Sequence, residues 1–523
     1  MRLPIRLLTV TSRRRAQRGQ AIILGSLSFL VLALMVTLSF NLGHALRQKM
    51  GLQQHSDALA YSMAVLEARA LNYYAVSNRA IAASYVAMNS VHAYMAASSV
   101  TGQMMRASQQ NFNDIAAMEA LLCASCKTCF IHCIHAMEAR QIAGKFARAG
   151  RDYDSKVRGL ESNFNAAVRG LDVMVDNLHA SQRTLHTRTR QAVQDGRSSG
   201  LDQLMRFSAP DASNLPDAVG GLNANEFDCA VDGMDCRGSV ASSSTQARAK
   251  VMTEIANATR SGWPASRKHK KGFGISLQKP NYLHRQFFQE LRDIPNRGTY
   301  LVTSHQGTAK TVDGVGDVDS PGQRDQNPGR VSAAQEEGTL FHQWRHGFGT
   351  NDYTSRVWSD ANGGGHDPNG AHSGSHTFQG VNANAFASCA RTGNCFMKFR
   401  ANPSSARDWG QPRVYSSLTR PLRMGDPSRA PWELNSSAQV RVGHGEQGEA
   451  SLTLAAQEGV VVSKALVYYH RFGPNGWREA PTLFSPYWRA KLHPISGDEA
   501  AEVLDAAGNS DASRLAQVPG VSL

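Results

Sequence analysis

The stretch AIILGSLSFLVLALMVTLSF, residues 21–40, contains no charged residue, and a dozen of its side chains are Leu, Ile, Val or Phe. A helix of this length, rising about 1.5 Å per residue, covers about 30 Å, which matches the hydrocarbon core of a bilayer. On the insertion scale its apolar side chains contribute about −5 kcal/mol in total, which outweighs the few Ser, Thr and Gly residues. The sequence therefore predicts that this stretch crosses a membrane.

The charges around the stretch indicate its orientation. Only Arg47 and Lys49 follow it closely, whereas six arginines precede it: Arg2, Arg6, Arg13, Arg14, Arg15 and Arg18. The positive-inside rule then places residues 1–19 in the cytoplasm and the body of the chain beyond the membrane. A cleaved signal peptide is the alternative, but its apolar region is shorter and ends in a small-x-small cleavage site. The sequence predicts a single-pass inner-membrane protein with a periplasmic or extracellular body.

A pattern of residues flanks the predicted span. Residues 13–64 contain a basic lead, then Arg18, Gly19, Gln20 and Ala21, and after the apolar stretch Leu52, Gln53, Asp57, Ala58 and Ala60. In these positions the segment resembles TadE/TadG-like proteins of the tight-adherence (Flp) pilus-assembly system. The resemblance implies a membrane-anchored, non-enzymatic component with pilus or secretion-apparatus proteins as partners. It also implies a prepilin-peptidase site between Gly19 and Gln20, but Leu24 stands where pseudopilins carry the Glu that accompanies cleavage.

Composition fits a protein that is mostly outside the membrane. The chain has 523 residues, 41% of them hydrophobic, and a formal net charge of +14. Part of this charge lies in the cytoplasmic segment, and the remaining cations are scattered along the chain. A nucleic-acid partner is not predicted, because the sequence has no finger, helix-turn-helix or aromatic RNA-binding pattern.

Residues 44–200 have the composition of long helices. Ala, Met, Leu, Gln, Arg and Glu dominate, and no proline occurs between Pro4 and Pro210. Apolar residues recur at steps of three and four and predict a helical-hairpin or coiled-coil seam. The seam comprises Val157, Leu160, Phe164, Ala167, Leu171, Met174, Leu178 and Leu185. Packing within the chain and homo-oligomerisation through this seam both remain open.

Four cysteines lie close together in LLCASCKTCFIHCIHAMEA: Cys123, Cys126, Cys129 and Cys133. Their spacing is that of a bacterial iron–sulfur run, but the proline that usually follows the last ligand is absent. Disulfides are favoured beyond the membrane, where thiols are oxidised. Zinc or copper bound by these cysteines with His132 and His135 is another alternative, as are unpaired thiols. The sequence does not fix the connectivity.

The other cysteines form two short pairs around glycine-containing turns. Cys229 and Cys236 lie in DCAVDGMDC, and Cys389 and Cys395 bracket CARTGNC. Such pairs are typical of small disulfide loops in exported proteins. The even total of eight cysteines is consistent with four bridges.

Beyond residue 200 the helical pattern ends, and Gly, Ser, Asn and Asp become frequent. Residues 298–305, 437–443 and 451–472 have the alternation or the β-branched content of strands. The predicted fold class is therefore α+β. Its predicted order is a cytoplasmic stub (1–19), a transmembrane helix (20–43), a helical stalk (44–200), a linker (201–239), a β-containing exported module (240–495) and a flexible tail (496–523).

Near the C-terminus an aromatic run predicts either a docking surface or a segment held against the core by its rings. It contains Trp477, Phe484, Tyr487 and Trp488. Motifs for nucleophilic, zinc-hydrolase or nucleotide chemistry are absent from the sequence, so we predict no catalytic residue and no cofactor. An envelope redox or metal-binding protein that uses the Cys123–Cys133 cluster is the alternative to a pilus-assembly component.

Overall fold

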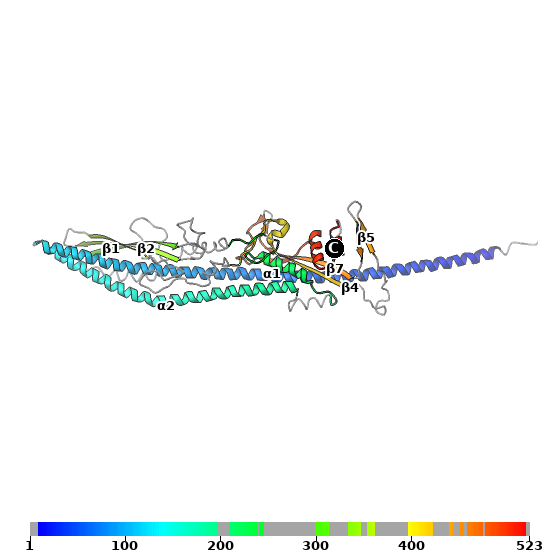
Figure 1. Ribbon diagram of the computed structural model, residues 1–523, viewed down its shortest axis with the longest axis horizontal. Coiled ribbons are helices and arrows are strands. Elements are labelled where there is room, and N and C mark those ends of the chain that lie inside the picture. Colours follow the sequence, from blue (N-terminus) through cyan, green and yellow to red (C-terminus); the bar gives the residue numbers. More distant parts are fainter. Residues whose placement is uncertain are drawn as a thin grey trace, which may run out of the picture.

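The computed structural model is mainly helical and contains small antiparallel sheets, which agrees with the α+β class (Figure 1). The structure describes residues 9–126, 128, 130–196, 209–238, 240–244, 299–312, 333–346, 353–360, 396–421, 439–443, 449–453, 458–473 and 476–518. A few predictions fall outside these ranges, among them the loop between Cys389 and Cys395.

Two long helices form an antiparallel hairpin that runs through the molecule. Helix α1 (Thr9–Ser125) has 117 residues and contains the predicted span, and helix α2 (Phe130–Asp195) returns alongside its distal part (Figure 1). At about 1.5 Å per residue α1 is about 175 Å long. The absence of proline from this part of the sequence permits such a continuous helix. From Thr9 onward the predicted stub, the span and the first half of the stalk are therefore one helix.

The predicted seam of α2 is correct in part. Its half-buried members are Leu160, Phe164, Leu171, Leu178 and Leu185, whereas Ala167 and Met174 lie one residue away from buried positions. Buried residues recur every seven positions and are Glu161, Val168, Val175, Gln182 and Thr189. By contrast, Ala167 and Met174 of the predicted seam are exposed. Some of the buried positions hold polar residues, such as Glu161 and Gln182. A search for apolar side chains alone therefore chooses adjacent apolar residues instead. The predicted hairpin is present, and its contact face includes more than half of the predicted seam.

A three-stranded antiparallel sheet packs on α1 just beyond the apolar stretch. Its order is β10 (Trp488–Leu492), β7 (Glu458–Tyr469) and β4 (Arg413–Pro421). One face lies on α1, where Ser463 of β7 bonds to Asp57. The opposite face lies against α9 (Gly497–Ala506), where Lys464 bonds to Glu499. We call this sheet, its helices and residues 52–88 of α1 the head.

The core of the head joins the two ends of the chain. Its buried side chains come from α1, from α4 (Asp217–Ala230), from the sheet and from α9. They include Leu59, Met63, Leu71, Tyr74, Val219, Phe227, Val414, Leu418, Ala465, Tyr469, Trp488, Val503 and Leu504. The sequence predicts a stalk followed by a separate β module, but here α1 is the centre of the head.

Asparagine side chains from helices cover both edges of this sheet. Asn72 of α1 donates to the carbonyl of Trp488 at 2.9 Å and accepts from its N–H at 3.0 Å. Asn223 of α4 makes the same pair of bonds to Tyr415 on the opposite edge, at 2.9 and 2.8 Å. Each amide therefore occupies one position where a neighbouring strand would bind, which blocks pairing between chains at that point of the edge.

Two segments differ from the predicted linker and tail. The predicted linker contains α4, whose first helical residue follows Pro216, so this proline precedes a helix rather than only ending one. The predicted flexible tail forms α9 and α10 (Ser510–Ala516). A capping box between Ser496 and Glu499 starts α9, and its small apolar residues are buried in the core.

The remaining strands form smaller units. Strands β1 (Thr299–Val312), β2 (Ala333–His346) and β3 (Tyr353–Asp360) make an antiparallel sheet in that order. Strands β5 (Gln439–Gly443) and β6 (Glu449–Thr453) pair, as do β8 (Phe472–Gly473) and β9 (Gly476–Trp477). A short 3-10 segment, η2 (Ser405–Gly410), precedes β4. The three segments predicted as strands all contain strands.

Candidate functional site

The N-terminal part of α1 exposes a continuous apolar surface. Every residue from 21 to 36 is exposed, and Phe29 has 75% of its surface accessible. Among the described residues one helix is long and apolar enough to cross a membrane, and it contains this stretch. Such a long apolar surface is stable in lipid and costly in water.

The residues just after the apolar stretch attach α1 to the sheet. Leu52 and Ala60 are completely buried in the core. Gln53 donates to Asp57 at 2.9 Å and to the hydroxyl of Ser463 at 3.0 Å, and this hydroxyl donates to Asp57 at 2.6 Å. These are positions of the pattern in which the sequence resembles TadE/TadG-like proteins. In this chain they fix the helix to β7.

A chain of alternating charges crosses the opposite side of the sheet. Arg413 makes two bonds to Glu226, at 2.7 and 3.1 Å, and one to Glu499 at 3.1 Å. Lys464 donates to Glu499 at 2.8 Å and to Asp408 at 3.3 Å. We call Glu226, Arg413, Glu499, Lys464 and Asp408 the ionic chain. It connects α4, β4, α9, β7 and η2, and its two cations are at most 7% exposed.

The pKa of Glu499 is strongly shifted within the ionic chain. Burial raises its pKa, but hydrogen bonds from Lys464 and from the Ser496 N–H, with the charges of Lys464 and Arg413, lower it to about 2. Because this carboxyl has a lower pKa in the folded than in the unfolded protein, its contribution is present above about pH 4.5 and is lost as the pH falls toward 2.

We expect acid to weaken the head through this group. Between about pH 4.5 and pH 2 the free energy of unfolding should fall by up to about 3 kcal/mol more in the wild type than in Glu499→Gln. Urea denaturation of both proteins at several pH values measures the difference. Parallel pH profiles for the two proteins would contradict the assignment.

A second polar cluster joins three helices. Tyr74 of α1 lies 3.2 Å from Nδ1 of His186, and Nε2 of His186 lies 2.9 Å from Asp228 of α4. Arg190 donates to the other carboxylate oxygen of Asp228 at 2.8 Å. The order of Tyr, His and Asp resembles a proton relay. Because Tyr74 is completely buried, a substrate cannot reach its hydroxyl, and the cluster acts as a clamp between helices.

Glu67 lies buried near this cluster. Its side chain is completely buried, and among the described residues neither carboxylate oxygen has a hydrogen-bond partner. Burial raises its pKa well above the usual value, and the charges of Glu226 and Asp228 add to this effect. The carboxyl is therefore held in its neutral form at a cost to the fold.

Replacing Glu67 by methionine should stabilise the head by about 1–3 kcal/mol at neutral pH. The gain should grow as the pH rises above the pKa of a Glu in the unfolded chain. In that range the wild type loses its Glu67 proton when it unfolds, which favours the unfolded state. Thermal unfolding at pH 5 and pH 8 measures both effects. Glu67→Gln is the matched control, which removes the pH dependence but keeps a buried polar group. A destabilised Glu67→Met protein would show that the carboxyl has a partner on which the fold depends.

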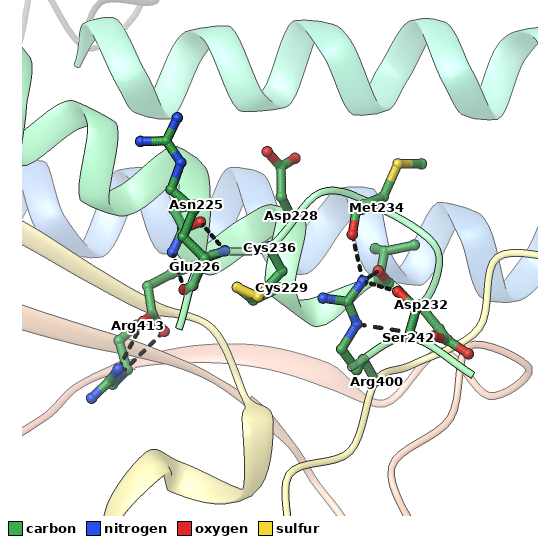
Figure 2. Close-up of a disulfide and its surroundings, with 12 residues drawn as sticks. Asn225, Glu226, Asp228, Cys229, Asp232, Met234, Cys236, Ser242, Arg400 and Arg413 are labelled. Carbon is green, nitrogen blue, oxygen red and sulfur yellow. Dashed lines mark hydrogen bonds and ion pairs between the residues drawn. A yellow bond between two sulfur atoms is a disulfide. The ribbon is translucent and has the colours of Figure 1, made fainter. Parts of the chain in front are cut away.

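A disulfide closes the loop that follows α4. Cys229 and Cys236 are bonded, with their Cα atoms 4.8 Å apart, which is the short loop that their spacing predicts. Figure 2 shows Arg413 reaching Glu226 on one side of this bond and Arg400 reaching Met234 and Ser242 on the other. A small polar pocket beside it is lined in part by Glu226, Arg413 and Arg407. Its size suits a water molecule or a small ion rather than an organic substrate.

The tip of the hairpin contains the cysteine cluster. Cys123 of α1 and Cys133 of α2 form a disulfide with Cα atoms 5.0 Å apart. Cys126 is also disulfide-bonded, and Cys129 lies outside the described residues. A bonded pair leaves fewer than the four thiolates that an iron–sulfur cluster requires. The same bond removes Cys123 and Cys133 as ligands for zinc or copper.

Other predicted residues fall in less informative places. Gly19 and Gln20, the predicted peptidase site, lie within the continuous α1. In the aromatic run Trp488 is buried in the core and Trp477 packs against it, so this part of the run is held against the core rather than forming a docking surface. The ionic chain could not be predicted from the sequence, because its five members come from five separate elements and follow no regular spacing.

Comparisons of this chain with protein-family models, with curated proteins and with solved structures found no match. Its function is therefore inferred from its residues and their arrangement.

Proposed function

We propose that this chain is a membrane-anchored, non-enzymatic component of a tight-adherence-type pilus-assembly or secretion apparatus. One observation supports this proposal above the others. The exposed apolar stretch of residues 21–36 continues without a break into the part of α1 that forms the core of the head. A helix that is apolar and exposed at one end and buried in a fold at the other is suited to connect a membrane to an exported body.

The proposed location is the inner membrane, with the N-terminus in the cytoplasm. The six arginines before the span favour this orientation. The disulfides Cys123–Cys133 and Cys229–Cys236 support export, because such bonds persist in oxidising compartments. From Phe40 to Leu52 the helix advances by about 18 Å, so the head would lie next to the membrane surface.

The proposed mechanism is mechanical. The hairpin would extend about 110 Å from Leu52 to its tip at Ser125. We call this hairpin the arm; it would be rigid and attached to the span through α1 alone. Movement of the span within an assembly would then be carried to the tip without a hinge. Partners would bind the span in the bilayer and the arm outside it, and homo-oligomerisation through the arm is part of this proposal.

The pilus assignment depends on the pattern in residues 13–64, and the contacts of Gln53 and Asp57 support a role for that pattern in joining the anchor to the head. A photocrosslinking scan in the native membrane tests the assignment. Reactive groups at the exposed positions Leu27, Phe29 and Met35 should produce adducts with pseudopilin-like or other assembly proteins. Adducts with lipid alone at every position would contradict it.

The buried position Leu59 is the matched control and should crosslink only within the chain. A reporter fused to the C-terminus gives an independent test of topology. It should be active only beyond the inner membrane, and activity confined to the cytoplasm would overturn the proposal.

A further inference from the structure

Three metal-binding side chains meet at the tip of the hairpin, next to the disulfide. Glu119 comes from the last part of α1, and His132 and His135 come from the first turns of α2. One ligand atom from each of the three lies within 4.8 Å of the others. Nδ1 of His132 is 2.7 Å and Nδ1 of His135 is 3.5 Å from the same oxygen of Glu119.

The surroundings of Glu119 indicate that its charge requires a partner. Its side chain is completely buried, and among the described residues its Oε1 atom has no hydrogen-bond partner. His135 is 1% exposed, whereas His132 is 18% exposed and gives the cluster a side open to solvent. A buried carboxylate is costly unless it is paired or coordinates a metal. Both histidines lie against Oε2, so among the described residues Oε1 is left without a partner.

The ligand set and its spacing fit a divalent transition metal. Two imidazole nitrogens and one carboxylate oxygen form a common three-ligand zinc site, with water in the fourth position. With bonds of about 2.0–2.1 Å, tetrahedral ligands lie about 3.4 Å apart. The separations of 2.7 and 3.5 Å from the Glu119 oxygen lie on either side of this value, and all three ligand atoms lie within 4.8 Å of one another, so side-chain movements can bring them around one ion.

The Cys123–Cys133 disulfide holds the three side chains close together before any metal binds. Cys123 is one helical turn after Glu119, and Cys133 is adjacent to His132, so the bond holds both ligand-bearing segments in register. It also excludes these two sulfurs from the coordination shell.

We propose that Glu119, His132 and His135 bind one divalent transition-metal ion, with zinc as the best fit, and that the ion crosslinks α1 and α2 at the tip. This site differs from the cysteine-based site considered from the sequence, because its third ligand is a carboxylate. The inference does not depend on the pilus assignment.

Zinc titration of the oxidised, untagged full-length protein in detergent tests the proposal. After removal of metal, competition with a chromophoric chelator should show one bound zinc ion. In Glu119→Gln and in His135→Ala its affinity should fall by more than the roughly 10–100-fold that loss of an outer-shell partner costs. His179→Gln, which changes a histidine of α2 outside the cluster, is the matched control and should bind like the wild type. Unchanged zinc stoichiometry and affinity in both ligand variants would overturn the site, as would a wild type that binds no zinc.

Two further measurements distinguish lost ligands from lost structure. Without metal, the melting temperatures of Glu119→Gln and the wild type should be similar, and zinc should raise only that of the wild type. X-ray absorption of the zinc-loaded protein should show a coordination shell of nitrogen and oxygen. A shell that contains sulfur would assign the metal to cysteines and overturn the proposal.

Discussion

Replacing Arg413 by methionine should lower the free energy of unfolding of the head by about 3 kcal/mol, because it leaves two partly buried carboxylates without their shared cation. Arg413 is 7% exposed and bonds both Glu226 of α4 and Glu499 of α9. These helices lie far apart in the sequence and meet through this side chain. Urea denaturation of the full-length protein in detergent, followed by tryptophan fluorescence, measures the loss.

Arg420 on the same strand provides a matched control. Its partner Asp211 is 72% exposed at a distance of 3.4 Å, so Arg420→Met should cost less than about 1 kcal/mol. A variant that removes the charges together, Arg413→Met with Glu226→Gln and Glu499→Gln, should recover part of the lost stability. Equal losses in Arg413→Met and Arg420→Met would show that the ionic chain has no special importance.

Introducing arginine at both Leu27 and Leu34 should release the protein from the membrane. Each exchange changes the insertion free energy by about 3 kcal/mol, and the sum of about 6 kcal/mol exceeds the favourable contribution of the apolar side chains in the span. Both residues are exposed, at 57% and 47%, so the substitutions leave the packing of the head unchanged. Alkaline extraction of membranes should move the variant from the pellet to the soluble fraction.

The control for this experiment places arginine at apolar residues that are exposed outside the span. Leu121 and Met137 near the tip are 73% and 58% exposed, and arginine at both positions should leave the protein in the membrane pellet. If the Leu27 and Leu34 variant also stays there after extraction, residues 21–40 are not the anchor.

Features that depend on local composition could be predicted from the sequence. The apolar run of residues 21–40, the absence of proline up to Pro210, and the short spacing of Cys229 and Cys236 each have a structural consequence within a few turns of chain. The helical hairpin and the small disulfide loop follow from these features. The strands at β1, β5 and β7 likewise follow from their alternation and β-branched residues.

Features that depend on contacts between distant segments could not be predicted. The true seam of α2 contains Glu161 and Gln182, which are polar and therefore do not mark a buried face. The ionic chain and the asparagine contacts at the sheet edges use common surface residues whose burial is visible only in the fold. At the tip, Glu119 stands 13 residues before His132 in the sequence, and the turn between α1 and α2 brings them together.

The position of α1 at the centre of the head has a consequence for biosynthesis. Leu59 and Tyr74 are made early, whereas Trp488 and Leu504, which are buried in the same core, are made late. Contacts of such long sequence separation form slowly, while the hairpin needs only nearby residues. The arm should therefore take shape while the rest of the chain is still being translocated, and the surface of α1 that awaits the sheet must be shielded by chaperones until the C-terminus emerges.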